Sequence, residues 1–119
     1  MVVDDSPLAR KLITLSLERA GYRVLTAEDG LEALERIPVE RPELVVLDVI
    51  MPKMDGLQVC RRLKQDPGLA AIPVVVLTTQ AQGKDREAAQ KAGADDYLTK
   101  PFSPGKLRAI VERLLRASP

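Results

Sequence analysis

The chain has 119 residues, enough for one domain with a core of its own, and it contains one cysteine and no histidine. The single cysteine, Cys60, excludes an internal disulfide, and the lack of histidine excludes Cys/His metal clusters, catalytic triads and phosphohistidine on this chain. With 18 basic and 17 acidic side chains, the net charge of +1 gives no support for binding to nucleic acid or anionic lipid.

The N-terminal residues lack the apolar run of a signal peptide, and no stretch approaches the roughly 20 apolar residues of a membrane span. We therefore expect a cytoplasmic protein with no membrane association and no direct contact with nucleic acid. Carboxylates, hydroxyls and lysines must then carry any reaction.

Five short apolar runs, rich in β-branched residues, alternate with segments of helical periodicity. The runs cover residues 1–3, 22–26, 44–47, 73–77 and 96–99, and each is predicted to be a strand. After the first run, Ser6 and Pro7 predict the N-cap and the first residue of a helix that Gly21 ends. The helical spacing of this segment is marked by Leu8, Leu12, Leu15 and Arg19.

The second and third predicted helices each begin at an aspartate. The second helix runs from Asp29 to Pro38, where the proline is expected to end it. The third runs from Asp55 to about Asp66, which Pro67 follows. The residues predicted to face inward are Leu31, Leu34 and Ile37 in the second helix and Leu57, Cys60 and Leu63 in the third.

Two further helices complete the pattern. The fourth covers about residues 84–92 and is closed by Gly93. The last begins with Ser103 and Pro104, which repeat the signal that starts the first helix. Its predicted buried residues are Leu107, Ile110, Val111 and Leu114.

Strict alternation of strands and helices predicts an α/β fold with a doubly wound, five-stranded parallel sheet and helices on both faces, spanning residues 1–119 as one domain. Ligands bind outside the carboxyl ends of the strands in such sheets. The residues at these predicted ends are Asp4, Asp5, Asp48, Thr78 and Lys100. Each of them alone is as compatible with an ordinary loop, strand or surface role, and only the combination indicates a site.

The three aspartates would repel one another and raise one another's pKa unless a cation lay between them. An all-oxygen ligand set favours Mg²⁺, which keeps water ligands and open positions for a phosphate. VVDDSP stands where a glycine-rich nucleotide loop would follow the first strand, so the site favours a phosphoryl group over a nucleotide. Asp48, with three apolar residues on each side, is the candidate nucleophile that would become an aspartyl phosphate.

Four segments, VVDDS, VVLDVIMPKMDG, VVVLTT and GADDYLTKPF, occur in this order through nearly the whole chain. They resemble the receiver (CheY-like) domains of two-component response regulators. The resemblance implies a flavodoxin-like sheet of strand order 2-1-3-4-5. It also implies a signalling domain, not an enzyme acting on other substrates, in which Asp48 accepts a phosphoryl group from a histidine kinase or a phosphotransfer protein.

The same resemblance implies a set of metal ligands. Asp5 and Asp48 would bind Mg²⁺ directly, and Asp4 would bind it through a water molecule. The backbone carbonyl of Ile50 would supply a further ligand.

The resemblance also implies how phosphorylation is read. Lys100 would pair with the phosphoryl oxygens and the Thr78 hydroxyl would donate to one of them, which opens space for Tyr97 to rotate. This change would alter the face formed by the fourth helix, the fifth strand and the fifth helix, where an output domain or protein binds. The peptide bond between Lys100 and Pro101 is expected to be cis.

The lifetime of the phosphorylated form is predicted from residues two positions beyond the site. Ile50 follows Asp48 by two residues and Gln80 follows Thr78 by two, so both side chains are expected to lean over the phosphoryl group. A branched apolar side chain at Ile50 would obstruct the water that hydrolyses the aspartyl phosphate.

Two other functions stay open at this stage. A Mg²⁺-dependent phosphatase of the aspartyl-phosphate type would need an acid two residues after the nucleophile, where Ile50 stands. A degenerate receiver that serves only as an unphosphorylated interaction scaffold would share the fold, but the complete set of acids with Thr78 and Lys100 argues against it.

Overall fold

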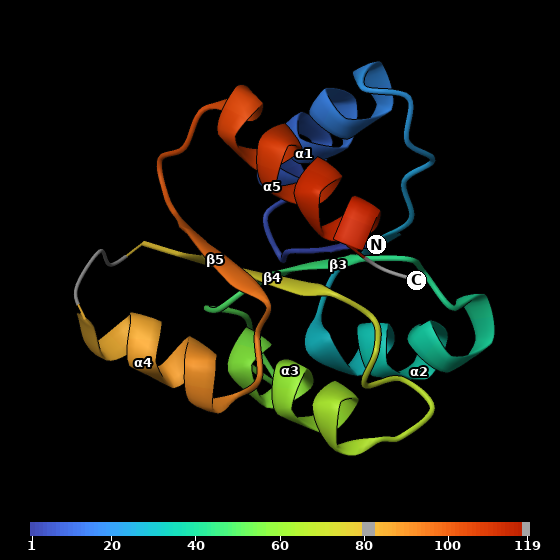
Figure 1. Cartoon of the computed structure of the whole chain (residues 1–119), viewed down its shortest axis with the longest axis vertical. Helices are drawn as coiled ribbons and strands as arrows, with labels where there is room; N and C mark the ends of the chain where they lie inside the picture. The colour runs from blue at the N-terminus through green and yellow to red at the C-terminus, as the bar shows by residue number, and fades with distance from the viewer. Residues whose placement is uncertain (80–82, 118–119) are drawn as a thin grey trace.

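The computed structural model describes residues 1–79 and 83–117, and within them the strands form one parallel sheet in the order β2-β1-β3-β4-β5 (Figure 1). The strands are β1 (Val2–Val3), β2 (Thr26–Ala27), β3 (Val45–Asp48), β4 (Val74–Thr78) and β5 (Asp96–Thr99). The predicted fold class and strand order are therefore confirmed.

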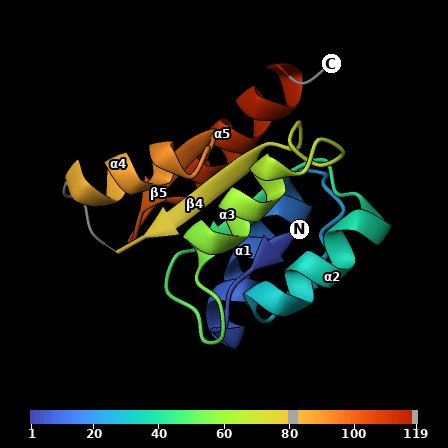
Figure 2. The ribbon, with the colours of Figure 1, turned by 90° about the horizontal axis from the view of Figure 1, so that it is seen from below.

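Helices cover both faces of this sheet. They are α1 (Pro7–Arg19), α2 (Gly30–Glu40), α3 (Gly56–Gln65), α4 (Gly83–Lys91) and α5 (Pro104–Ala117). α1 and α5 lie on one face, and α2, α3 and α4 lie on the other (Figures 1 and 2). None of the helices in the described part of the chain is both long enough and apolar enough to span a membrane.

The central strands β3 and β4 are buried along their whole length, because helices cover them on both sides. Successive side chains of a strand point to opposite faces, so each strand contributes to two core clusters. On the α2–α3 side the cluster includes Val45, Leu47, Val74, Val76, Ile37, Val59 and Leu63. On the α1–α5 side it includes Val46, Val75, Leu77, Ile13, Leu17, Leu107 and Val111.

The second strand is shorter than predicted. The predicted strand at 22–26 is wrong in its bounds, because the structure forms a strand only at Thr26–Ala27. Within the described residues β2 lies at the sheet edge and pairs with β1, whose two residues, Val2 and Val3, face Thr26 and Ala27. Strand length at this edge is thus set by the partner, not by the apolar run.

The prediction that Pro38 ends the second helix is also wrong. α2 continues to Glu40 and ends where Arg41 takes a left-handed conformation with φ of 45°. The Arg41 N–H donates to the carbonyl of Ile37 at 2.8 Å. A proline in the last turn removes one helical hydrogen bond, and the apolar face that buries Ile37 keeps the helix in place.

α1 has two apolar stripes, and only one of them packs against the sheet. The leucines at helical spacing, Leu8, Leu12 and Leu15, are 67%, 58% and 40% exposed, whereas Ile13 and Leu17 are buried. Both stripes have helical periodicity, so periodicity alone does not select the buried one. In α2 the predicted inward position of Leu31 is wrong, since this side chain is 44% exposed.

The predicted helix caps are confirmed. The Ser6 side chain accepts from the Ala9 N–H at 3.2 Å, and Asp55 forms a reciprocal capping box with Gln58 at the start of α3. These caps fix the helix starts that follow β1 and β3. The loops that join β1 to α1 and β3 to α3 lie at the carboxyl edge of the sheet.

Candidate functional site

The residues predicted to form the site gather at the carboxyl edge of the sheet. Asp4 and Asp5 directly follow β1, and Asp48 is the last residue of β3. Thr78 ends β4, and Lys100 directly follows β5. Because the strands are parallel, these ends meet at one edge.

Asp4 is fully buried and held from several sides. Its N–H donates to the Ala27 carbonyl at 3.2 Å, and its Oδ1 accepts from the Ser6 N–H at 2.9 Å. Its Oδ2 lies 3.4 Å from Nζ of Lys100. A carboxylate in this setting has a fixed orientation before any ligand arrives.

Asp48 is 7% exposed, and its Oδ1 lies 3.3 Å from the same Lys100 ammonium. Burial raises the pKa of Asp48 above its usual range, the negative charge of Asp4 raises it further, and Lys100 opposes the shift only in part. The ionised form of Asp48 is therefore under-compensated. A further cation at this edge would relieve it.

The start of α3 lies directly against Asp48. A Cβ on Gly56 would come within 2.2 Å of the Asp48 carbonyl oxygen, so only glycine fits at this position. The Gly56 N–H donates to the Val49 carbonyl at 2.9 Å. This close approach fixes the loop that carries the residues after Asp48.

The acidic cluster fits a hard divalent cation. One carboxylate oxygen from each of Asp4, Asp5 and Asp48 lies within 4.8 Å of the others. Asp4 and Asp48 are buried, while Asp5 is exposed, so one side of the cluster is open to water. Oxygen ligands with room for water are the coordination that Mg²⁺ prefers.

Thr78 is brought next to Lys100 through the backbone. Thr78 is 5% exposed, and its carbonyl accepts from the Lys100 N–H at 2.6 Å. The Lys100 side chain is 25% exposed and extends to the acidic cluster. The peptide bond between Lys100 and Pro101 is cis, as predicted.

The structure describes one of the two residues predicted to tune the lifetime of the phosphorylated form. β3 ends at Asp48, so the alternation of a strand does not carry over to Ile50, whose side chain is 67% exposed. Gln80 lies outside the described residues. The roles of these two residues stay predictions.

Tyr97 lies on β5 and faces the α2–α3 side of the sheet, partly buried against that core cluster. The guanidinium carbon of Arg86, on α4, lies 5.4 Å from the centre of the Tyr97 ring. The neighbouring Asp96 pairs with Arg113 of α5. Contacts of the predicted switch residue and its neighbour thus join β5 to both α4 and α5.

Sequence reasoning missed Arg10. Its Nη1 donates to the main-chain carbonyl of Asp4 at 2.7 Å. The available signal was position, because a long cationic side chain in the first turn of α1 can reach back to the strand end that the helix follows. No motif marked this residue.

The chain is similar to known proteins over nearly its whole length. A family model described as the response regulator receiver domain matches residues 1–112. The alkaline phosphatase synthesis transcriptional regulatory protein PhoP of Bacillus subtilis is 45% identical over 118 residues, covering 99% of this chain and 48% of that protein. The DNA-binding dual master transcriptional regulator RpaA of Synechocystis is 42% identical over 116 residues, covering 98% and 48%. The chain spans about half the length of these curated relatives.

Solved structures agree with this fold. The receiver domain of a signal transduction histidine kinase from Syntrophus aciditrophicus is 39% identical with a TM-score of 0.92, covering 98% of this chain and 88% of that one. The receiver domain of a sensor histidine kinase from Pseudomonas aeruginosa is 31% identical with a TM-score of 0.89, covering 97% and 94%. The latter is described with a magnesium ion coordinated in its active-site cleft.

Proposed function

The chain belongs to the family of response regulator receiver domains, and from this membership we propose that Asp48 accepts a phosphoryl group from the phosphohistidine of a partner histidine kinase or phosphotransfer protein. The family consists of signalling domains of two-component systems and not of classical enzymes. We propose that the chain catalyses only its own phosphorylation and dephosphorylation.

The observation that carries this proposal is the imbalance of charge around Asp48. Three carboxylates approach within 4.8 Å of one another, and one ammonium, that of Lys100, lies between two of them. Burial and Asp4 raise the pKa of Asp48, which means that the ionised cluster would be stabilised by a bound cation. The bound cation could in turn help to bind an anionic group. A phosphoryl group bound with Mg²⁺ meets both needs.

In the proposed transfer, an oxygen of ionised Asp48 forms a bond to phosphorus while the bond from phosphorus to the donor's imidazole nitrogen breaks. The imidazole leaves with the bonding electrons and takes up a proton. Asp5 and Asp48, with Asp4 through a water and the carbonyl of Ile50, would hold Mg²⁺. The ion supplies neutralisation of the negative charge on the carboxylates and the transferred oxygens.

Lys100 and Thr78 are proposed to bind the transferred group. The distances of 3.3 and 3.4 Å from Nζ of Lys100 to Asp48 and Asp4 are long for charge-assisted hydrogen bonds, so the ammonium can exchange these partners for phosphoryl oxygens. The Thr78 hydroxyl, on the adjacent strand end, would donate to another oxygen. Lys100 and Thr78 would then contact phosphoryl oxygens in place of the carboxylate oxygens that Lys100 contacts now.

The output of this change is proposed to be the surface of α4, β5 and α5. Tyr97 would rotate toward the space that Thr78 leaves, which alters its contact with Arg86 and the packing of α4 on β5. An output domain or protein would read this surface. The curated relatives named above are transcriptional regulators about twice as long as this chain, so transcriptional control is the output we propose for the whole protein.

The test is to incubate the chain with a small phosphodonor and Mg²⁺ and to measure its intact mass. We expect the gain of one phosphoryl group in the native chain and none in Asp48→Asn, which keeps the shape of the side chain without its nucleophile. Omission of Mg²⁺ should strongly slow the reaction. A native chain that gains no phosphoryl mass would instead favour the unphosphorylated scaffold.

A further inference from the structure

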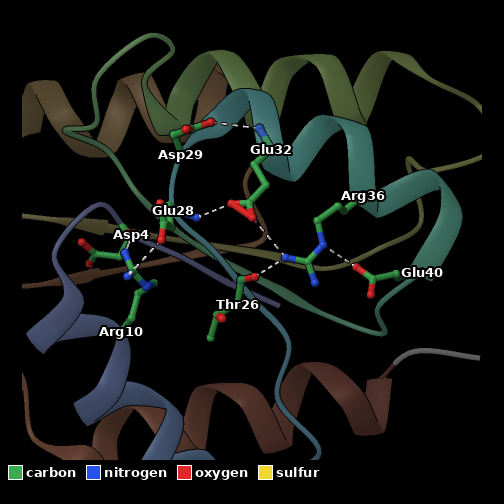
Figure 3. A network of polar contacts seen from close by, with 8 residues as sticks. All are labelled: Asp4, Arg10, Thr26, Glu28, Asp29, Glu32, Arg36 and Glu40. Carbon is green, nitrogen blue, oxygen red and sulfur yellow. Dashed lines mark hydrogen bonds and ion pairs between the residues drawn. The ribbon is translucent and has the colours of Figure 1, made fainter.

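Arg10 binds the backbone of a proposed metal-site residue without occupying its carboxylate. Nη1 of Arg10 donates to the Asp4 carbonyl at 2.7 Å, and the Arg10 side chain is only 16% exposed. Figure 3 shows the guanidinium between Asp4 and Glu28. A charged donor in a mostly buried position makes this bond stronger than one between neutral groups.

The Asp4 backbone has few other supports. β1 pairs with its neighbours at Val2 and Val3, so Asp4 lies just beyond the ladder, and within the described residues its backbone makes one other hydrogen bond, from its N–H to the Ala27 carbonyl. The Arg10 bond therefore fixes the carbonyl side of the peptide that joins Asp4 to Asp5. Rotation of this peptide would turn both carboxylates of the pair.

The two cations near the acidic cluster act differently. Lys100 pairs with carboxylate oxygens of Asp4 and Asp48, so it occupies oxygens that a metal ion or its water ligands need. Among the contacts within residues 1–79 and 83–117, Arg10 meets no carboxylate of the cluster. Arg10 can thus support the site in both its metal-free and metal-bound forms.

The second contact of Arg10 is weak. Nη2 lies 3.8 Å from Oε1 of Glu28, whose side chain is 74% exposed. Exposed pairs of this length contribute little. Glu28 itself is tied to α2, because its N–H donates to Oε2 of Glu32 at 2.7 Å (Figure 3). The hydrogen bond to the Asp4 carbonyl is therefore the stronger of the two contacts of Arg10.

We propose that Arg10 is a positioning residue for cation binding: it holds the Asp4–Asp5 peptide so that the two carboxylates converge with that of Asp48. The inference rests on the proposed function for the identity of the cation. It concerns the unphosphorylated chain, so it is tested apart from phosphoryl transfer.

The hydrogen bond of Arg10 and its positive charge predict opposite changes in Mg²⁺ affinity when Arg10 is replaced. The positive charge of Arg10 repels a cation, so loss of the charge alone would tighten Mg²⁺ binding. Loss of the hydrogen bond would loosen the carboxylates and weaken binding. The sign of the change therefore separates the two roles.

The experiment is a Mg²⁺ titration of the unphosphorylated chain, followed by the backbone amide NMR signals of Asp5 and Ser6 and by calorimetry. We expect Arg10→Met, which has similar length and no donor, to weaken Mg²⁺ binding about tenfold, as loss of a residue that orients a metal ligand commonly does. Arg10→Lys, which can still donate to the carbonyl, should fall in between. The matched control, Glu28→Gln, should bind Mg²⁺ like the native chain.

Each other outcome overturns the inference. Tighter binding by Arg10→Met would show that charge dominates, and a lower melting temperature with unchanged Mg²⁺ affinity would show a purely structural role. If Arg10→Met does not fold, native-like affinity in Arg10→Lys together with weakened affinity in Glu28→Gln would assign the effect to the ion pair. A native chain that binds no Mg²⁺ would overturn the proposed metal site itself, whereas equal binding by all variants would overturn only the role of Arg10.

Discussion

Two lysines at opposite edges of the same sheet differ in their surroundings, one within a closed hydrogen-bond network and the other beside the proposed ligand site. At the amino edge of β4 and β5, Nζ of Lys64 donates to the carbonyls of Ala70 and Ile72 at 3.0 and 2.7 Å and to Oδ2 of Asp95 at 2.9 Å. An ammonium has three protons, and all three have partners here.

At the carboxyl edge, the contacts of the Lys100 ammonium with described residues are long, 3.3 and 3.4 Å, and reach two carboxylates of a cluster of three. Within the described residues, Lys100 is the cation that pairs with carboxylates of this cluster, and it pairs with two of the three. The amino edge is thus balanced in charge and hydrogen bonds, whereas the carboxyl edge is not. A buried group of carboxylates with too little positive charge gains free energy when it binds a cation, whereas a group whose charges are already paired does not.

The neighbouring residues strengthen the contrast. Gly93, with φ of +89°, leaves room for the Lys64 stem, which a Cβ would meet at 2.9 Å. Oδ2 of Asp95 also accepts from the Val74 N–H at 2.8 Å, which joins α3, β4 and β5 in one network. The surroundings of Lys64 are therefore built around one fixed position of its ammonium.

The largest expected effect comes from breaking the balanced edge. Lys64→Met should lower the free energy of unfolding by about 2–4 kcal/mol, because two carbonyls and one carboxylate lose their donor in a partly buried place. Urea denaturation measures the change. Addition of Mg²⁺ should restore none of it, and a loss below about 0.5 kcal/mol, within the range of ordinary surface substitutions, would show that the network is not structural.

The same substitution at the unbalanced edge should behave differently. Lys100→Met should lower the free energy of unfolding by about 1–2 kcal/mol in metal-free buffer, less than at Lys64 because the lost contacts are longer, 3.3 and 3.4 Å against 2.7 to 3.0 Å. Mg²⁺ should restore this loss, since a bound cation replaces the missing ammonium and stabilises the folded state by mass action. A loss that Mg²⁺ does not reverse would contradict the comparison.

The sequence predicted much of the carboxyl edge of the sheet. The contacts that it did not predict have a common cause. Asp48 and Lys100 could be placed at one edge because parallel strands bring their ends together, and Asp55 could be assigned as a cap from its position before an apolar run. The Lys64 network joins residues up to 31 positions apart, and nothing local marks it. Local sequence patterns predict helices, strands and their ends. Contacts between side chains that are distant in the sequence depend on how the elements pack, which the sequence patterns do not show.

Asp48 provides the next test, because its pKa is raised in the folded state. The folded chain then holds this proton more tightly than the unfolded chain, so ionisation of Asp48 destabilises the fold. The penalty is absent below the ordinary value of 3.8, grows as the pH rises toward the raised pKa, and is complete above it.

Asp48→Asn removes this penalty. In metal-free buffer at neutral pH it should raise the melting temperature by about 4 °C, which corresponds to roughly 1 kcal/mol in a domain of this size. The difference should vanish as the pH falls through the window toward 3.8. Thermal melts across that window decide the matter, and an equal gain at every pH would assign the effect to packing and not to charge.

The smallest expected effect concerns how water reaches the unbalanced edge. Ile50 follows Asp48 by two residues in the loop after β3, and its side chain is 67% exposed while that of Met51 is buried. The branched apolar side chain gives a water molecule no hydrogen bond and takes up space near the predicted phosphoryl group, whereas an asparagine amide can hold such a water in line with phosphorus. Because most of the Ile50 side chain is in solvent, its shielding can only be partial. We expect the phosphorylated form of Ile50→Asn to hydrolyse about threefold faster than that of the native chain at saturating Mg²⁺, a change of roughly 0.6 kcal/mol in the barrier.

The matched control for this prediction is Val39→Asn on α2, which also replaces an exposed β-branched side chain, 81% exposed, and leaves the acidic edge unchanged. Both substitutions should leave the melting temperature nearly constant, so a difference in lifetime between them reports on the site alone. The decay of the phosphorylated mass with time gives both rates. Equal rates for the two variants would mean that water already reaches the aspartyl phosphate past Ile50, and the lifetime would then be set by the residues proposed to hold the phosphoryl oxygens, Thr78 and Lys100.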